Sequence, residues 1–143
     1  MKKKLIVAVV DGKGGGIGKT LIERIKKENL EVEIIALGTN SAATSNMMKS
    51  GADNGASGEN AIIYNAKRAD IIVGVLGLLI SNSMLGEVSY KIAEAIGESQ
   101  ALKVLIPLEK CNVALTNSNN LSLKENIDNA AKIVKEYIEK NCK

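Results

Sequence analysis

The residues with the most chemical potential form one glycine-rich segment near the start of the chain. Residues 11–19 read Asp-Gly-Lys-Gly-Gly-Gly-Ile-Gly-Lys. Glycine lets the backbone adopt positive φ and lets a ligand approach without a Cβ in the way. A helix that begins at such a turn directs unpaired N–H groups and the positive end of its dipole toward it, which suits an anion. The segment therefore predicts a site for a phosphorylated ligand, with a nucleotide as the leading candidate.

The segments on either side of this turn predict a strand and a helix. Residues 4–10 contain a continuous apolar run, which is typical of a strand buried on both faces in a parallel sheet. Residues 17–25 carry apolar side chains at helical spacing. A second apolar run, residues 32–37, is closed by Gly38, so residues 4–37 match the length of a βαβ unit.

The rest of the chain predicts alternating helices and strands. We expect helices at residues 42–50, 59–68 and 87–96, strands at residues 71–75, 103–108 and 113–116, and a loop of small residues at 53–58. Segment 59–68 also fits a strand, but a helix is favoured because a parallel strand follows it. The last helix begins with Ser122 and Glu125 in the spacing of a capping box.

This alternation predicts an α/β fold. We expect one Rossmann-like domain over residues 1–143, with a doubly wound, mainly parallel sheet of about five strands in a three-layer α/β/α arrangement. The expected strand order is 3-2-1-4-5, with residues 71–75 as the third strand and 113–116 as a short last one. Ligands in such sheets bind beyond the carboxyl ends of the strands at the switch point, which here is the turn at residues 12–18.

The glycine spacing allows three interpretations of the turn. The dinucleotide fingerprint G-x-G-x-x-G fails because Ile17 stands where its third glycine is required. The spacing of Gly12, Gly16 and Gly18 instead resembles the G-x-x-x-G-x-G turn of the short-chain dehydrogenase/reductase family. It matches that pattern at all three glycines, which implies a nicotinamide dinucleotide as cofactor.

The third interpretation is a phosphate-binding loop of the Walker A type. Gly18, Lys19 and Thr20 match the end of G-x-x-x-x-G-K-[ST], but Lys13 stands at its first glycine. Residues 13–20 are also similar to the deviant Walker loop of the ParA and MinD ATPases with one extra glycine. One inserted residue misplaces the lysine and the hydroxyl, and no later strand ends in the Asp that would hold Mg²⁺. A P-loop-like ATPase therefore ranks below the dinucleotide site.

The end of the second strand bears on the choice of cofactor. NAD sites of this type have an acid there for the ribose hydroxyls, and residues 37–41 contain none. Lys13 in the turn, with Thr39, Asn40 and Ser41 opposite, could receive a 2′-phosphate instead. The sequence therefore favours NADP(H) over NAD, with a related adenine nucleotide as the wider class.

Two sets of residues are expected to contact ligands. Those expected to bind the cofactor are Asp11, Gly12, Lys13, Gly14, Gly15, Gly16, Ile17, Gly18, Lys19, Thr39, Asn40, Ser41 and Gly74. Those expected to contact a second substrate, from loops on the same rim, are Glu59, Asn60, Ser83, Glu87 and Cys111. No metal ligand is assigned, because the chain has no histidine and no C-x-x-C.

Catalytic residues stay unassigned. The reductase family carries a Tyr-x-x-x-Lys pair, whereas Tyr64 is followed at that spacing by Arg68 and Tyr90 by Glu94. An NAD(P)-dependent enzyme or cofactor-binding subunit is the first hypothesis. A non-catalytic nucleotide sensor or interaction module is the alternative from another class.

Composition excludes several other classes. The 19 Lys and Arg residues nearly balance 16 Asp and Glu, and three Tyr with no Phe or Trp leave no stacking platform, so no nucleic-acid partner is expected. The longest apolar stretch, residues 71–80, is too short to span a bilayer. Two cysteines do not make a disulfide framework, which predicts a reduced cytoplasmic protein. The apolar content of so small a domain is compatible with a homodimer.

Five segments together resemble an uncharacterised bacterial family described only as a domain of unknown function. The resemblance covers nearly the whole chain and implies a small Rossmann-like protein that stands alone as one domain. It implies no catalytic residue. The segments are Asp-Gly-Lys-Gly-Gly-Gly-Ile-Gly-Lys at 11–19, Ala-Leu-Gly-Thr-Asn-Ser-Ala-Ala-Thr-Ser at 36–45, Gly-Glu-Asn-Ala at 58–61, Ser-Met-Leu-Gly-Glu at 83–87 and Cys-Asn-Val at 111–113.

Overall fold

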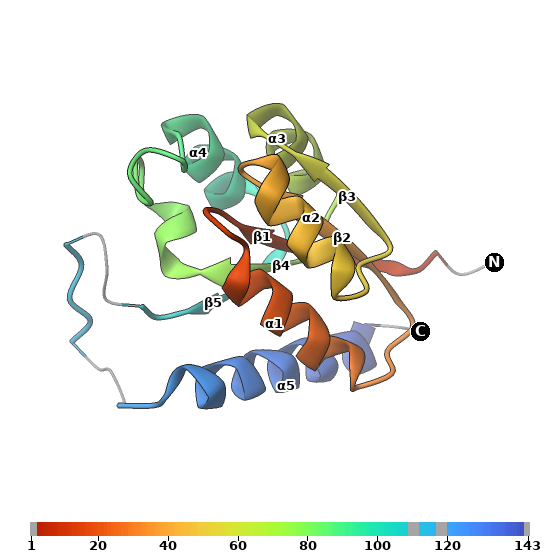
Figure 1. Cartoon of the computed structure of the whole chain (residues 1–143). Coiled ribbons are helices and arrows are strands. Elements are labelled where there is room, and N and C mark those ends of the chain that lie inside the picture. The colour runs from red at the N-terminus through yellow and green to blue at the C-terminus, as the bar shows by residue number, and fades with distance from the viewer. Residues whose placement is uncertain (1–2, 109–111, 117–119, 142–143) are drawn as a thin grey trace.

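The computed structural model describes residues 3–108, 112–116 and 120–141. Its centre is a parallel sheet whose strands lie in the order β3-β2-β1-β4-β5 (Figure 1). The strands are β1 (Leu5–Asp11), β2 (Val32–Gly38), β3 (Asn54–Ser57), β4 (Ile71–Val75) and β5 (Leu102–Ile106).

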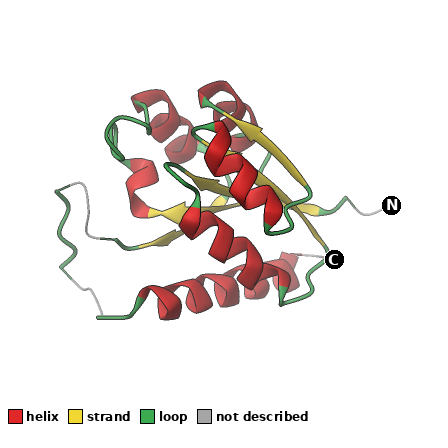
Figure 2. Ribbon diagram, viewed as in Figure 1, coloured by secondary structure: helices red, strands yellow, loops and turns green. Residues whose placement is uncertain are grey.

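Helices cover both faces of this sheet (Figure 2). On one face α1 (Gly16–Lys26) packs against α2 (Ser41–Lys49) and α5 (Leu123–Asn141), and on the other α3 (Glu59–Ala66) packs against α4 (Tyr90–Glu98). A short 3₁₀ helix, η1 (Leu76–Leu79), follows β4. The predicted doubly wound, three-layer α/β fold is therefore confirmed. Within the described ranges, no helix is long and apolar enough to cross a membrane.

The first strand occupies the centre of the sheet, as its continuous apolar run predicts. Leu5–Asp11 pairs in parallel register with Val32–Gly38, and residues 7–9 pair with residues 71–73 on the other side. The side chains at 7–9 are fully buried, because helices cover both faces of the strand. This register brings the carboxyl end of β1 level with that of β2, and the chain leaves β1 there through the glycine turn.

The prediction of a loop at residues 53–58 is wrong, because residues 54–57 form the edge strand β3. Its sequence, Asn-Gly-Ala-Ser, lacks the β-branched and aromatic residues that mark strands. Pairing with residues 35–38 of β2 creates it. Thr44 of α2 fastens it, donating from Oγ1 to the carbonyl of Ala56 at 3.2 Å and accepting from Ser57 Oγ at 2.7 Å. Backbone pairing and polar contacts thus replace apolar burial.

The prediction of a short last strand at residues 113–116 is also wrong. These residues lie beyond β5 without ladder partners among the described residues, and their side chains are exposed or only partly buried. Four residues between polar segments offer too little apolar surface to extend the sheet. Since β3 takes the third place, Ile71–Val75 is the fourth strand and lies on the opposite side of β1 from β2.

Side-chain caps set the ends of two helices. The predicted capping box is confirmed, because the N–H of Glu125 donates to Ser122 Oγ and the N–H of Ser122 donates to Glu125 Oε1, each at 3.1 Å. The helix expected to start at residue 87 starts at Tyr90. Ser89 caps it by accepting from the N–H of Ile92 at 3.2 Å, so residues 80–88 remain a loop.

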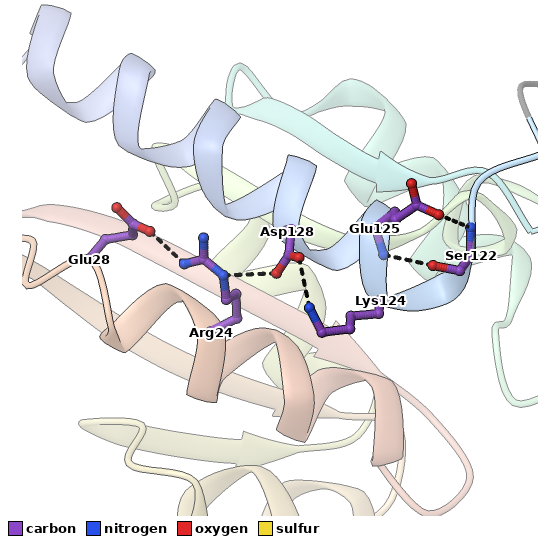
Figure 3. A network of polar contacts seen from close by, with 6 residues as sticks. All are labelled: Arg24, Glu28, Ser122, Lys124, Glu125 and Asp128. Carbon is purple, nitrogen blue, oxygen red and sulfur yellow. Dashed lines mark hydrogen bonds and ion pairs between the residues drawn. The ribbon is translucent and has the colours of Figure 1, made fainter.

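Charged side chains fasten the last helix to α1 (Figure 3). Arg24 Nε lies 2.9 Å from Asp128 Oδ1, and the same guanidinium pairs with Glu28 in the turn that follows α1. Lys124 and Lys135 of α5 complete the network, on Asp128 and Glu28 respectively. Apolar side chains of α5 are buried below it, namely Ile127, Ala130, Ala131, Val134 and Ile138. The helix that follows the glycine turn is thus held from outside by α5.

Candidate functional site

A cavity of about 630 Å³ opens beyond the carboxyl ends of β1 and β4. The glycine turn and the start of α1 form one wall, and the segment that follows β4 forms the other. This is the switch point at which the strand order reverses direction, where doubly wound sheets bind ligands. The lining residues are Asp11, Gly12, Lys13, Gly14, Gly15, Gly16, Ile17, Val75, Gly77, Ile80, Ser81, Asn82, Ser83, Met84, Leu85 and Leu108.

The turn itself is tight because two of its residues adopt left-handed conformations. Lys13 has φ 51° and Gly15 has φ 72°, and the N–H of Gly15 donates to the carbonyl of Gly12 at 2.9 Å. Gly15 also packs against α2, since a Cβ there would lie 2.7 Å from the carbonyl oxygen of Ala43. The fold therefore requires glycine at position 15.

The other glycines of the turn divide into two groups. At Gly12 a Cβ would lie 2.7 Å from Met84 Sδ, and at Gly18 it would lie 2.4 Å from Met47 Sδ. At Gly14 and Gly16 an added Cβ would meet no atom of the described residues within 4 Å, and neither glycine has positive φ. Gly14 and Gly16 line the cavity, so packing and backbone conformation do not explain why these two positions lack a side chain.

Asp11 connects β1 to the start of α1. Its Oδ2 accepts from the N–H of Gly18 at 2.7 Å, and its Oδ1 accepts from the N–H of Gly12 at 2.8 Å. Burial raises the pKa of the Asp11 carboxyl, the N–H groups of Gly18 and Gly12 oppose that shift, and the charge of Glu87 adds to it. Asp11 therefore fills part of the helix N-terminus with a carboxylate of the protein's own.

Glu87 joins the loop before α4 to the turn and to the end of β2. Its Oε1 accepts from Thr39 Oγ1 at 2.6 Å, from the N–H of Lys13 at 2.8 Å and from Asn40 Nδ2 at 2.9 Å. The Thr39 hydroxyl and the Lys13 N–H, with the Asn40 amide, hold the pKa of Glu87 below its ordinary value against the opposing effect of burial. Residues 37–41 at the end of β2 contain no acidic residue of their own. Glu87, from the loop before α4, therefore places a carboxylate there.

The loop at residues 80–88 forms the far wall of the cavity. Asn82, Met84 and Leu85 have φ between 55° and 64°, a backbone conformation that residues other than glycine rarely adopt. A hydrogen bond closes the loop, because the N–H of Asn82 donates to the carbonyl of Val88 at 2.7 Å. Ser83 Oγ also donates to the carbonyl of Gly77 at 2.6 Å. Ser83, expected to contact a substrate, is buried and instead braces this loop.

Several expected site residues lie outside the cavity. Lys19 points outward on the exposed face of α1, and Gly74 lies inside β4, where a Cβ would be 2.4 Å from Leu78 Cδ1. Ser41, Glu59 and Asn60 are exposed at the starts of α2 and α3, and Glu59 accepts from Ser89 Oγ. Cys111 falls outside the described residues.

Sequence reasoning missed most of the far wall. Val75, Ile80 and Leu108 give it an apolar surface, and Ser81 and Asn82 give it polar groups. The continuous apolar run at residues 71–80 was a usable signal, because it extends past the length of one strand.

The described lining is poor in charge. Asp11 and Lys13 are the ionisable side chains among the described residues that line the cavity. The described part of the chain also contains no group of three His, Cys, Asp or Glu residues placed to hold a metal ion. What the arrangement offers chemically is a glycine-lined polar end with one lysine, and an apolar end for a ring or chain.

Two solved structures resemble this fold. A dodecameric FMN-dependent Ubix-like decarboxylase from Escherichia coli O157:H7 has a TM-score of 0.50 and 15% identity, with 94% of each chain covered. A universal stress protein from Archaeoglobus fulgidus has a TM-score of 0.39 and 16% identity, with 71% of this chain and 97% of that chain covered. At such identities, the first likeness shows a shared α/β fold. No curated protein sequence matches the chain.

The sequence also matches one family model along almost its whole length. The match runs over residues 6–139, from the first strand through the last helix, and includes the glycine turn and the loop that carries Glu87. The chain therefore belongs to the family described as Domain of unknown function (DUF3842).

Proposed function

We propose that this protein binds a nucleotide, with a phosphate group at the glycine turn and the ring system in the cavity. The observation that carries the proposal is the open space at Gly14 and Gly16, both of which line the cavity. Glycine lowers stability relative to alanine unless the backbone or a neighbouring group requires it, and neither the backbone conformation nor any described residue near these two positions requires it. A ligand that approaches the backbone closely accounts for both glycines.

The cavity fits a ligand of this kind in size and polarity. Its volume of about 630 Å³ lies within the range of about 300–1,000 Å³ that is usual for small-molecule sites. Val75, Ile80 and Leu108 form an apolar surface for a flat ring. At the other end the first turn of α1 and Lys13 attract an anion, although Asp11 uses the N–H of Gly18.

The geometry disfavours a P-loop ATPase. α1 begins at Gly16, so Lys19 and Thr20 lie beyond its first three residues rather than at its start. Thr20 Oγ1 donates to the carbonyl of Gly16 at 3.0 Å, and Lys19 is exposed outside the cavity. A lysine and a hydroxyl in these places do not reach a phosphate seated on the turn, unlike those of a Walker A loop.

Three ligands, NADPH, NADH and FMN, are therefore the leading ones to test. NADPH and NADH follow from the spacing of the glycines, and FMN is added because the decarboxylase with a similar fold is described as FMN-dependent. The experiment is thermal unfolding of the purified protein with each ligand, and with ATP plus Mg²⁺. At about one hundred times Kd, binding should stabilise the native state by roughly 2.7 kcal/mol, which raises Tm by about 5–11 °C at about 2–4 °C per kcal/mol in a domain near this size.

The glycine positions supply matched variants. Gly16→Val fills the proposed approach of the phosphate and should abolish the ligand-induced rise in Tm while leaving the Tm of the free protein nearly unchanged. Gly97→Ala is the control, because Gly97 is an exposed glycine of α4 outside the cavity, and a Cβ there would also meet no atom of the described residues within 4 Å. Its ligand response should equal that of the wild type. An unchanged response in Gly16→Val, or no response of the wild type to any of these ligands, would overturn the proposal.

A further inference from the structure

The strongest feature outside the cavity is the set of donors around Glu87. Three donors from two separate segments converge on one carboxylate oxygen, namely the Lys13 N–H from the turn and the Thr39 hydroxyl and Asn40 amide from the end of β2. All three contacts use Oε1. Within the described part of the chain, Oε2 of Glu87 receives no hydrogen bond.

The three donors fix the position of the carboxylate as well as its charge. Asn40 is itself held, because its Oδ1 accepts from the N–H of Ala43 at 2.9 Å as the N-cap of α2. The side chain of Glu87 therefore sits in a rigid place beside the turn, where a Cβ on Gly12 would lie 3.1 Å from Oε1. Because the same donors keep its pKa low, this carboxylate is ionised at neutral pH.

An ionised carboxylate oxygen accepts hydrogen bonds and donates none. Hydroxyl groups of a ligand are suitable partners for it, whereas a second anion is repelled. A nucleotide with its phosphate on the glycine turn extends its ribose toward the end of β2 in doubly wound folds, which is where Glu87 lies. Residues 37–41 contain no acid of their own for that ribose.

We propose that Glu87 determines the specificity of the site, accepting the hydroxyl groups of an unphosphorylated ribose and excluding ligands that carry a 2′-phosphate. This proposal rests on the nucleotide-binding function proposed above. It reverses the preference for NADP(H) drawn from the sequence, because Thr39 and Asn40, expected to receive a 2′-phosphate, already donate to Glu87.

The test compares NADH with NADPH, which differ only in the 2′-phosphate, by isothermal titration at fixed ionic strength. The wild type should bind NADH at least about tenfold more tightly, the effect expected of one like-charge contact at a partly exposed site. Glu87→Gln keeps an acceptor oxygen for the three donors but removes the charge, so the ratio of the two affinities should fall toward one. Glu59→Gln, on the same rim but without contact to the turn, should keep the wild-type ratio.

Three other outcomes overturn the proposed role of Glu87, and they distinguish its failure from a failure of nucleotide binding itself. Equal affinity of the wild type for both ligands, or an unchanged ratio in Glu87→Gln, refutes the role of Glu87 and leaves nucleotide binding intact. Binding of FMN with no binding of either dinucleotide has the same meaning. Because the wild-type ratio needs no substitution, the proposal stays testable if Glu87→Gln does not fold.

Discussion

The N–H of Gly18 donates to Oδ2 of Asp11 across 2.7 Å, so the last residue of β1 caps the helix that follows it. The residues are seven apart in the chain, and residues 12–17 of the glycine turn lie between them. The shape of the turn therefore depends on this carboxylate, and the first two predictions concern it.

Replacement of Asp11 by alanine should destabilise the protein. The N–H groups of Gly12 and Gly18 would both lose their acceptor in a buried place. The cost of leaving such groups unpaired is about 1–3 kcal/mol. Urea unfolding of Asp11→Ala against the wild type measures it. A midpoint equal to that of the wild type would show that the cap contributes nothing.

The pKa of Asp11 also predicts a dependence of stability on pH. Because burial raises this pKa in the folded state, the folded protein binds more protons than the unfolded chain between the ordinary value and the raised one. The contribution of Asp11 to stability is therefore present at lower pH and is lost as pH rises through that window. In Asp11→Asn that contribution should disappear. The measurement is the difference in the free energy of unfolding between the wild type and Asp11→Asn across acidic pH.

Gly15 and Gly14 should respond in opposite ways to alanine. Gly15 has positive φ and contacts the backbone of Ala43, so Gly15→Ala should cost about 1–3 kcal/mol. Gly14 has neither restriction, and Gly14→Ala should leave stability within about 0.5 kcal/mol of the wild type. Denaturant unfolding of the pair decides between these expectations. Equal losses in both variants would mean that the whole turn is needed for folding, which would remove the main argument for a ligand.

The ion network between α1 and α5 should stabilise the protein in a manner that depends on salt and pH. Arg24 holds the pKa values of Glu28 and Asp128 below their ordinary range. The stability that these carboxylates contribute is therefore present at neutral pH and lost as pH falls through their folded pKa values. Arg24→Met should lower Tm at neutral pH and low salt, with a smaller effect in acid or at high salt.

Lys124→Met is the control for that substitution. Its side chain is 87% exposed although it also pairs with Asp128, and exposed pairs contribute little. Its Tm should stay close to that of the wild type. A drop in Tm as large as that of Arg24→Met would assign the effect to net charge rather than to the contacts of Arg24 with Glu28 and Asp128 drawn in Figure 3.

The parts of the fold that were predictable are those with local or strongly apolar signals. A continuous apolar run predicts β1, and the spacing of Ser122 and Glu125 predicts the capping box. β3 gives no such signal, because its strand conformation comes from pairing with β2 and from the side chain of Thr44. A strand made by its neighbours cannot be read from its own residues.

The same distinction applies to the site. The glycine turn is contiguous in the sequence, and it lines the cavity. The contact of Glu87 with Lys13 joins residues that are 74 apart, and no property of either residue alone predicts it. Long-range contacts of polar side chains depend on loop conformation, here on the left-handed residues of the loop at 80–88.

The pairing of Arg24 with Asp128 has a consequence for the order of events during synthesis. The two residues are 104 apart in the chain, which at about 5–20 residues per second corresponds to roughly 5–20 s of translation. Throughout that interval α1 has been made while the helix that covers its outer face has not. α1 can pack against α2 during this interval, but it gains its contacts with α5 only when that helix emerges from the ribosome.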